Sequence, residues 1–365
     1  MGKYTCYLND AWVSWLKGEK FPVAFYGDST IDGNTTTGWV RNVLGTDSIN
    51  PGAFSKRLED KLRKATGNEV LRIYNAGFSG TTSNWAVDNF ENEFTGNSAY
   101  CDVKMIGIGF GINDRLLYKD LKSYKEGFKS NINKIIDLCF LHGIQPFLLT
   151  TQAIVEPGVT TTYINQYPLR TTVNVKTVAN QVKAELAYER RLELIDVNTY
   201  TEDFLLYSEY NLNTIIPDKL HFSDVGHEYE ADIIFSYINS QTIHVNKPCR
   251  IDYSCQRIVK SVPDDWLTLT STLNDPFKVY TNRTKTDNDD INIMSVYIFN
   301  HSERQLFIKA YKCQNDSKTY IKLDGKTIHM TELKNHLGRL ELGLHKLEVF
   351  SGHSQIVDFK GFIVE

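Results

Sequence analysis

Short apolar segments alternate with helical segments from residue 21 to about residue 240, and this alternation constrains the fold more than any other feature of the sequence. Apolar spacing in the intervening segments is helical, as in Phe54, Leu58 and Leu62. Strands separated by helices predict βαβ crossovers, so we expect a three-layer α/β/α fold (flavodoxin-like) with a parallel sheet. The five expected strands lie at residues 23–26, 70–74, 103–108, 147–150 and 192–197.

The pattern changes near residues 246–248, Asn-Lys-Pro. Beyond this point apolar and polar residues alternate with period two, as in residues 295–299 and 345–350, and turn-rich segments separate these runs. Such a pattern predicts a smaller all-β sandwich or jelly-roll domain, with helical spacing only at 331–337. We therefore expect two domains, 1–244 and 245–365.

Composition excludes several classes of function. Lys plus Arg number 40 and Asp plus Glu 44, a net charge of −4, which argues against a nucleic-acid partner because such proteins need a clustered basic excess. The longest apolar runs are strand-sized, so no membrane span is expected. The first fifteen residues lack the apolar core and cleavage site of a conventional signal peptide.

Four polar or glycine-rich segments follow expected strands or precede the last helix. Ligands of open parallel sheets bind beyond the carboxyl ends of the strands, so these segments are expected to meet at one rim. They read GDST at 27–30, NAGFSGT at 75–81, GFGIND at 109–114 and DKLHFS at 218–223.

The residue types at this rim suit nucleophilic catalysis. A serine hydroxyl becomes a nucleophile when an imidazole removes its proton, and a carboxylate must orient that imidazole. Ser29, His221 and Asp218 supply these three groups. The oxyanion needs preorganised donors, and we expect the Ser29 N–H, the Gly80 N–H and the Asn113 side chain to provide them.

Two alternatives use the same segments. Gly77 could replace Gly80 as the donor, although it is equally explained by a close backbone approach. Asp218, His221, Asp224 and His227 could instead ligate a transition metal. Their spacing matches no HExxH-type pattern, so we expect no metal and no cofactor.

The four segments resemble, in order and separation, the four blocks of the SGNH/GDSL hydrolase superfamily. Gly27-Asp28-Ser29 resembles the nucleophile block, although Thr30 stands where many members have an apolar residue. The other blocks are the glycine block with Gly80, the GxND block with Asn113, and the DxxH block with Asp218 and His221. The resemblance covers roughly residues 20–240 and implies metal-free hydrolysis of an ester or thioester through an acyl-serine.

The resemblance also suggests a substrate class. Members joined to a β-sandwich often resemble carbohydrate O-deacetylases, so we expect an acetylated glycan, with a lipase or thioesterase activity as the alternative. A further alternative is an idle carbohydrate-binding adhesin. Similar modules occur on bacteriophage tails, which favours an extracellular or virion-associated location. The C-terminal domain is expected to bind sugar, a partner protein or a second copy of the chain in a homo-oligomer.

Overall fold

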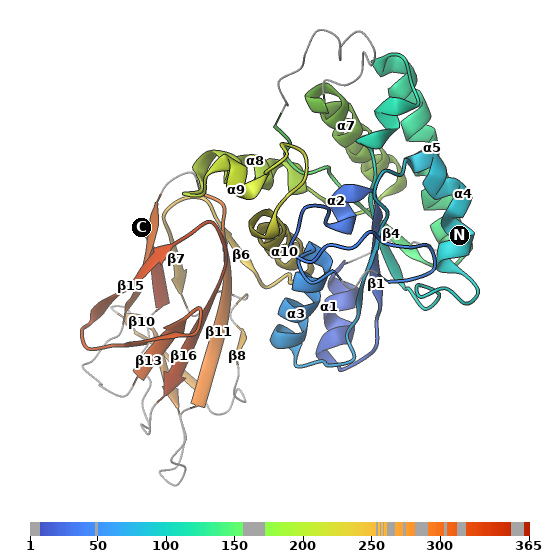
Figure 1. Cartoon of the computed structure of the whole chain (residues 1–365). Helices are drawn as coiled ribbons and strands as arrows, with labels where there is room; N and C mark the ends of the chain where they lie inside the picture. The colour runs from blue at the N-terminus through green and yellow to red at the C-terminus, as the bar shows by residue number, and fades with distance from the viewer. Residues whose placement is uncertain are drawn as a thin grey trace. The chain divides into compact units, whose positions relative to one another are not determined.

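The chain separates into two compact units (Figure 1), one of residues 1–205 and 209–238 and the other of residues 206–208 and 239–365. The boundary proposed after residue 244 falls within strand β6 (Ile243–Val245), which pairs with β11 (Ile291–Asn300) of the second unit. The computed structural model describes residues 8–47, 50–155, 172–252, 255, 257, 259–260, 267–272, 275–281, 291–302, 305–311, 319–351 and 361–365.

The first unit is built on a five-stranded parallel sheet with strand order β2-β1-β3-β4-β5. This arrangement confirms the predicted α/β class. Strand β1 pairs with β2 and β3 in register, so that Gly27 lies opposite both Gly77 and Gly109. Three strands therefore end in glycine along the rim where the polar segments begin. The strands are β1 (Val23–Gly27), β2 (Ile73–Gly77), β3 (Met105–Gly109), β4 (Gln145–Leu149) and β5 (Leu194–Ile195).

Helices cover both faces of this sheet. Phe25 of β1 contacts Phe54 of α3, whereas the next residue, Tyr26, contacts Phe90 of α4. Successive strand side chains point to opposite faces, so α3 and α4 lie on different sides. Helix α10 packs beside α1 and α3, and α5 packs beside α4 and α7. The helices are α1 (Leu8–Leu16), α2 (Ser29–Asp32), α3 (Phe54–Thr66), α4 (Ser83–Phe94), α5 (Leu121–Leu141), α7 (Thr172–Arg190), α8 (Val197–Tyr207), α9 (Leu212–Ile215) and α10 (Asp224–Ile238).

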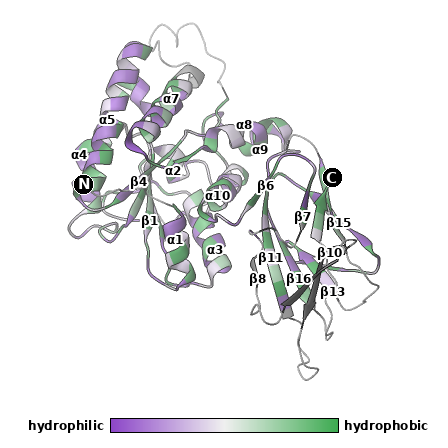
Figure 2. Cartoon of the chain, turned by 180° about the vertical axis from the view of Figure 1, so that it is seen from behind, coloured by the Kyte–Doolittle hydropathy of each residue, from purple (hydrophilic) through white to green (hydrophobic). Residues whose placement is uncertain are grey.

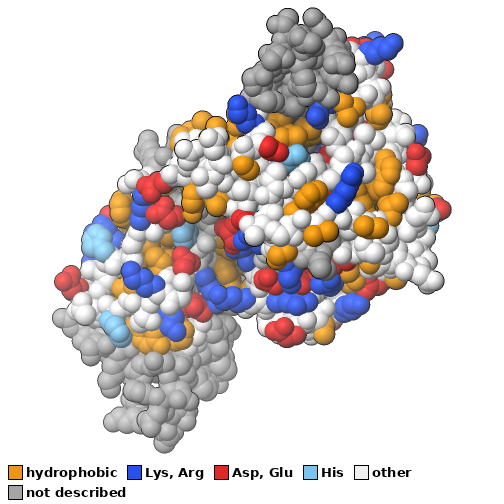
Figure 3. All heavy atoms as spheres, viewed as in Figure 1, with side chains coloured by type: hydrophobic (Ala, Val, Ile, Leu, Met, Phe, Trp, Pro, Cys, Tyr) orange, Lys and Arg blue, Asp and Glu red, His pale blue; other side chains and the backbone are white. Residues whose placement is uncertain are grey.

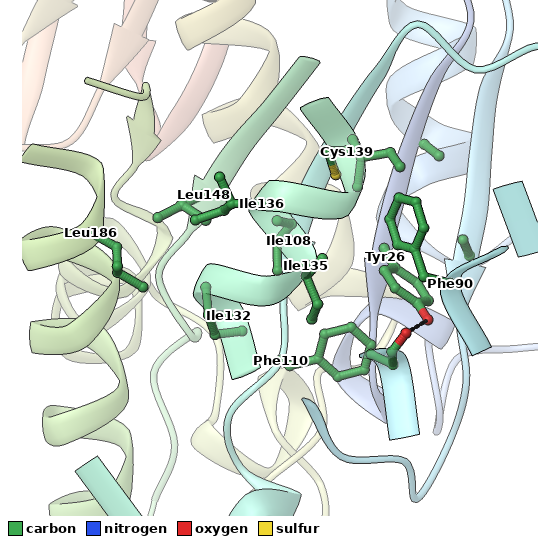
Figure 4. Close-up of a cluster of buried hydrophobic side chains, with 14 of the residues drawn as sticks. Tyr26, Phe90, Ile108, Phe110, Ile132, Ile135, Ile136, Cys139, Leu148 and Leu186 are labelled. Atoms are coloured by element: carbon green, nitrogen blue, oxygen red, sulfur yellow. Dashed lines mark hydrogen bonds between the residues drawn. The ribbon is translucent and has the colours of Figure 1, made fainter. Parts of the chain in front are cut away.

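The core between the sheet and the α4–α5–α7 layer contains aromatic and branched side chains (Figure 4). Tyr26 packs edge-on against Phe110 and Phe90, and its hydroxyl donates to the Ala86 carbonyl at 2.9 Å. The buried phenol therefore has a partner, which avoids the cost of an unsatisfied polar group. Figure 2 shows hydrophilic residues along the outer turns of α4 and α5, as expected for helices that bury one face.

The second unit is an all-β sandwich. One sheet has the order β14-β13-β16-β11-β6, with β8 also on β11, and another has the order β15-β12-β17-β7. Side chains of both sheets share one buried cluster, which includes Val296, Ile308, Val349 and Phe362. The strands are β6 (Ile243–Val245), β7 (Cys249–Asp252), β8 (Val259–Lys260), β9 (Leu267–Thr272), β10 (Asp275–Thr281), β11 (Ile291–Asn300), β12 (Leu306–Tyr311), β13 (Thr319–Leu323), β14 (Lys326–His329), β15 (Lys334–Leu340), β16 (Gly343–Ser351) and β17 (Gly361–Val364).

The helical spacing at residues 331–337 is misleading, because this segment leads into strand β15 (Lys334–Leu340). Asn335, Leu337 and Leu340 are buried, whereas Lys334 and His336 are exposed. This near-alternation is the period of a strand, and pairing with β12 decides the conformation.

Candidate active site

Three side chains form a continuous hydrogen-bonded series. One comes from near the start of the first unit's sequence, and the other two come from near its end. The Ser29 Oγ lies 2.7 Å from the His221 Nε2, and the His221 Nδ1 lies 2.6 Å from the Asp218 Oδ2. Ser29 is buried, with only 8% of its surface exposed. The structure thus brings together the serine, imidazole and carboxylate that the sequence suggested, in the order needed to activate a hydroxyl.

Ser29 is held at the start of α2 immediately after β1. Asp28 caps this helix, because its side chain accepts from the Thr30 N–H at 3.0 Å and from the Thr30 hydroxyl at 2.9 Å. Gly33 ends the helix in the left-handed region, with φ of 81°. Thr30, the departure from the usual first block, is therefore part of the cap that positions Ser29.

Asp218 and His221 share one tight loop before α10. The Asp218 Oδ1 accepts from the backbone N–H groups of Leu220 at 2.9 Å and His221 at 2.7 Å. Lys219 between them has φ of 68°, which shows how tightly the chain turns. Partial burial acts to raise the pKa of Asp218, but the hydrogen bonds from the His221 side chain and these two amides lower it to about 2.

Two of the expected oxyanion donors, Gly80 and Asn113, are linked at one turn. Gly80 has φ of +84°, a conformation that favours glycine. Asn113 begins the short 3-10 helix Asn113–Leu116, and its Nδ2 donates to the carbonyl of Thr81, the residue after Gly80, at 3.0 Å. Ser29 supplies the first amide of α2, which has no acceptor within the helix. The side-chain NH2 of Asn113 has two protons, and one of them remains for an oxyanion when the other bonds to the Thr81 carbonyl.

Gly77, the last residue of β2, and Gly80, in the turn that follows, require glycine for different reasons. A Cβ on Gly77 would lie 2.1 Å from the backbone N of Asp32, so only glycine allows α2 to pass over β2. A Cβ on Gly80 would meet only Arg41, with the Nη2 at 3.6 Å, and the constraint there is the positive φ. The close backbone approach considered for Gly77 is confirmed, whereas its role as a donor is left without support.

Three buried charged residues lie close to the candidate site, and one of them, Lys183, was not singled out in the sequence. Asp28 and Asp114 are each one residue from a candidate site residue, and both are almost fully buried. Lys183 of α7 is fully buried, and its Nζ donates to the Thr151 hydroxyl at 3.1 Å. Burial lowers the pKa of Lys183 to about 7, against the attraction of both carboxylates, and raises that of Asp114 to about 6. The signal for Lys183 was its helical spacing from the buried Ala179 and Ala187.

The metal alternative loses two of its ligands to other partners. Asp224 accepts from the Thr37 N–H at 3.3 Å and pairs with Arg57 at 3.1 Å. His227 is buried, and its Nδ1 accepts from the Phe54 N–H at 3.3 Å. Among the residues that the structure describes, no group of three His, Cys, Asp or Glu side chains could hold a metal ion.

The aromatic residues near the rim divide between the core and the surface. Phe78 and Phe110 are buried in the core, and Trp85 and Tyr74 pack against it. Trp39 is half-buried, and its Nε1 donates to the Asp32 Oδ2 at 3.1 Å. In the part of the chain with described structure, no helix combines the length and the apolarity needed to span a membrane.

Comparison with known proteins identifies one family. Residues 25–229 match the family model of the GDSL-like lipase/acylhydrolases. No curated protein matches the sequence.

Among solved structures, a two-domain esterase active on acetylated mannans is 14% identical, with 98% of this chain and 94% of that chain covered and a TM-score of 0.47. A lipase/acylhydrolase from Enterococcus faecalis is 19% identical over 60% of this chain and 95% of that chain, with a TM-score of 0.41. A catalytic mutant of an acetylxylan esterase from Geobacillus stearothermophilus is 17% identical over 60% of this chain and 94% of that chain, with a TM-score of 0.44.

Proposed function

Because the chain belongs to the GDSL-like lipase/acylhydrolase family, whose model spans residues 25–229, we propose that it is a serine esterase that removes O-acetyl or other short acyl groups from a carbohydrate. The observation that carries the proposal is the Ser29–His221–Asp218 hydrogen-bond series, with distances of 2.7 Å and 2.6 Å. An ester hydrolase needs no further group to activate its nucleophile.

In the first half-reaction the Ser29 Oγ attacks the acyl carbonyl carbon while the His221 Nε2 accepts the hydroxyl proton. The negative charge moves to the carbonyl oxygen, which the N–H groups of Ser29 and Gly80 and the side chain of Asn113 stabilise. The C–O bond to the sugar then breaks, and His221 returns the proton to the leaving hydroxyl. The product of this half-reaction is an acyl-serine.

In the second half-reaction water attacks the acyl-serine. His221 accepts a proton from the water, and the resulting tetrahedral oxyanion uses the same donors. The Ser29 Oγ leaves with that proton, which releases the carboxylic acid and restores the free serine. Asp218 stays ionised throughout, holds the imidazole in one tautomer and stabilises its charged form.

The carbohydrate part of the proposal rests on architecture. A separate all-β unit follows the hydrolase unit, as expected for an enzyme that acts on a polymer. Trp39 is half-buried, and its Nε1 donates to the Asp32 oxygen that also accepts from Ser79, the residue before Gly80. Aromatic faces are suited to stack on sugar rings. Long-chain lipase or thioesterase activity is the second candidate.

The test combines a fluorophosphonate probe, which labels activated serines, with an aryl acetate assay. We expect the wild-type chain to be labelled and active, and Ser29→Ala to lose labelling and at least about 10⁴-fold in kcat. Ser130→Ala, at an exposed serine on α5, is the matched control and should retain both. Labelling that persists in Ser29→Ala would contradict the assignment, and a folded wild type with neither signal would favour the idle adhesin.

Substrate class is tested separately by comparing release of acetate from acetylated glycans with hydrolysis of acyl-CoA and lysophospholipid. We expect acetate release to have the highest kcat/KM. Hydrolysis restricted to long acyl chains would exclude the deacetylase and favour the lipase alternative.

A further inference from the structure

Arg41 contacts the peptide group that carries a proposed oxyanion donor. Its Nη2 donates to the Ser79 carbonyl oxygen at 2.7 Å, and this carbonyl belongs to the same peptide unit as the Gly80 N–H. In a trans peptide the C=O and the N–H point in opposite directions within one plane. A side chain that holds the carbonyl of Ser79 therefore also sets the direction of the Gly80 N–H.

Ser79 is held from its side chain as well. Its hydroxyl donates to the Asp32 Oδ2 at 2.5 Å, and the Trp39 Nε1 donates to the same oxygen at 3.1 Å. Asp32 is the last residue of α2, the helix that begins with Ser29. The turn that presents Gly80 is thus tied to the helix that presents the nucleophile.

The segment that carries Arg41 is itself anchored. The Asn42 Nδ2 lies within hydrogen-bond distance of the carbonyl oxygens of Asn75 at 3.0 Å and Gly77 at 3.1 Å, and of the Tyr100 hydroxyl at 3.1 Å. The Asn42 side chain thus anchors the residue next to Arg41, whose own side chain is exposed. Within the described ranges of the chain Arg41 forms no ion pair, and its guanidinium donates to the Ser79 carbonyl.

We propose that Arg41 is a positioning residue that holds and polarises the Ser79–Gly80 peptide so that the Gly80 N–H stabilises the oxyanion. This inference rests on the proposed function, in which Gly80 is a donor. A charge-assisted hydrogen bond to a carbonyl is stronger than a neutral one, and hydrogen bonds in series strengthen one another.

The test replaces Arg41 and separates kcat from KM with an aryl acetate. Loss of a complete oxyanion donor costs about 10²–10³-fold in kcat, so a misdirected donor in Arg41→Met should cost about 10-fold or more, with KM within about two-fold. Arg41→Lys keeps the charge without the planar fork and should fall between wild type and Arg41→Met. The rate of labelling by the fluorophosphonate probe should fall in parallel. Lys64→Met, which removes an exposed cation on α3, is the control and should match wild type.

Two results would overturn the inference. A kcat of Arg41→Met equal to wild type would show that the peptide needs no such support, and a rise in KM alone would make Arg41 a substrate-binding residue. If Arg41→Met failed to fold, a wild-type kcat in Arg41→Lys would overturn it instead. The Ser29→Ala variant is measured alongside the Arg41 variants and should be inactive, which shows that the measured activity depends on Ser29. Activity that survives Ser29→Ala would instead defeat the proposed function itself.

Discussion

Asp218 shows how a half-exposed carboxylate can be matched to a single role. Its side chain is 42% exposed, yet three hydrogen bonds from within its own loop lower its pKa to about 2 against the effect of partial burial. The carboxylate is therefore ionised at every pH at which an esterase works. Loss of activity toward acid pH, down to about pH 4, should not come from the titration of Asp218.

We expect Asp218→Asn to lower kcat by about 10³–10⁴-fold, because the amide cannot hold the same imidazole tautomer. Stability should change with a defined pH dependence. The pKa of Asp218 is lowered on folding from 3.8, so its contribution is present above pH 3.8 and lost as the pH falls toward 2. Denaturant unfolding should therefore show Asp218→Asn less stable than wild type at pH 7 and equal to it near pH 2.

The control for this variant is Asp88→Asn, at an exposed carboxylate on α4. It should leave kcat unchanged. A kcat of Asp218→Asn within two-fold of wild type would exclude Asp218 as the partner of His221.

At the scale of elements, three glycines at the strand ends allow the nucleophile helix to sit on the sheet. Strands β1, β2 and β3 end at Gly27, Gly77 and Gly109, which are aligned in register. A Cβ on Gly27 would lie 2.2 Å from the Ile31 side chain, and one on Gly109 would lie 2.7 Å from it. At Gly77 the obstacle is backbone, 2.1 Å away, and backbone cannot rotate aside.

Gly77→Ala is therefore expected to displace α2 and with it Ser29. We expect a loss of about 1–3 kcal/mol in the free energy of unfolding, as for an overpacked core, and at least about ten-fold in kcat. Gly67→Ala is the control, because Gly67 has φ of +67° but open space around its Cβ position. It should cost about 1–2 kcal/mol from backbone strain with kcat unchanged. A wild-type kcat in Gly77→Ala would show that α2 tolerates the shift.

Element prediction succeeded where the pattern was strong and failed where packing decided. The helix around Leu58 and the stop at Gly67 follow from spacing and from a left-handed cap, and both are present. The strand expected at 70–74 lies instead at Ile73–Gly77, with Val70 55% exposed. Pairing of β2 with β1 sets that strand's limits, and local apolarity cannot report such pairing.

At the scale of the whole molecule, each unit has its own core. The buried cluster around Tyr26, Ile108 and Ile135 contains residues of the first unit only, and the cluster around Val296 and Phe362 contains residues of the second. All five candidate site residues lie in the first unit. Charged side chains of both signs are interspersed over the face shown in Figure 3.

Removal of residues 241–365 is therefore expected to leave the chemistry intact. The shortened chain retains α10, which ends at Ile238. It omits β6, because the partner strand β11 is also removed. Its kcat on a soluble aryl acetate should stay within about two-fold of the full chain, because no candidate site residue is removed. Loss of aryl acetate activity in a folded shortened chain would contradict the two-domain proposal.

The same pair of proteins tests the role of the second unit. If this unit targets the enzyme, binding to an acetylated polysaccharide should weaken in the shortened chain, as measured by co-sedimentation. Undiminished binding would exclude a targeting role.

The sequence alone determined the α/β class, the change to an all-β second half and the residue types of the candidate site, because these depend on local periodicity and short motifs. Tertiary structure decided which groups meet. Ser29 and His221 lie 192 residues apart in the chain, and the sheet brings them to 2.7 Å. Arg41 and Lys183 carry no motif, and their positions against the Ser79 carbonyl and the Thr151 hydroxyl appear only in the folded chain. Spacing along a chain reports a residue's own element, whereas contacts across elements depend on how those elements pack.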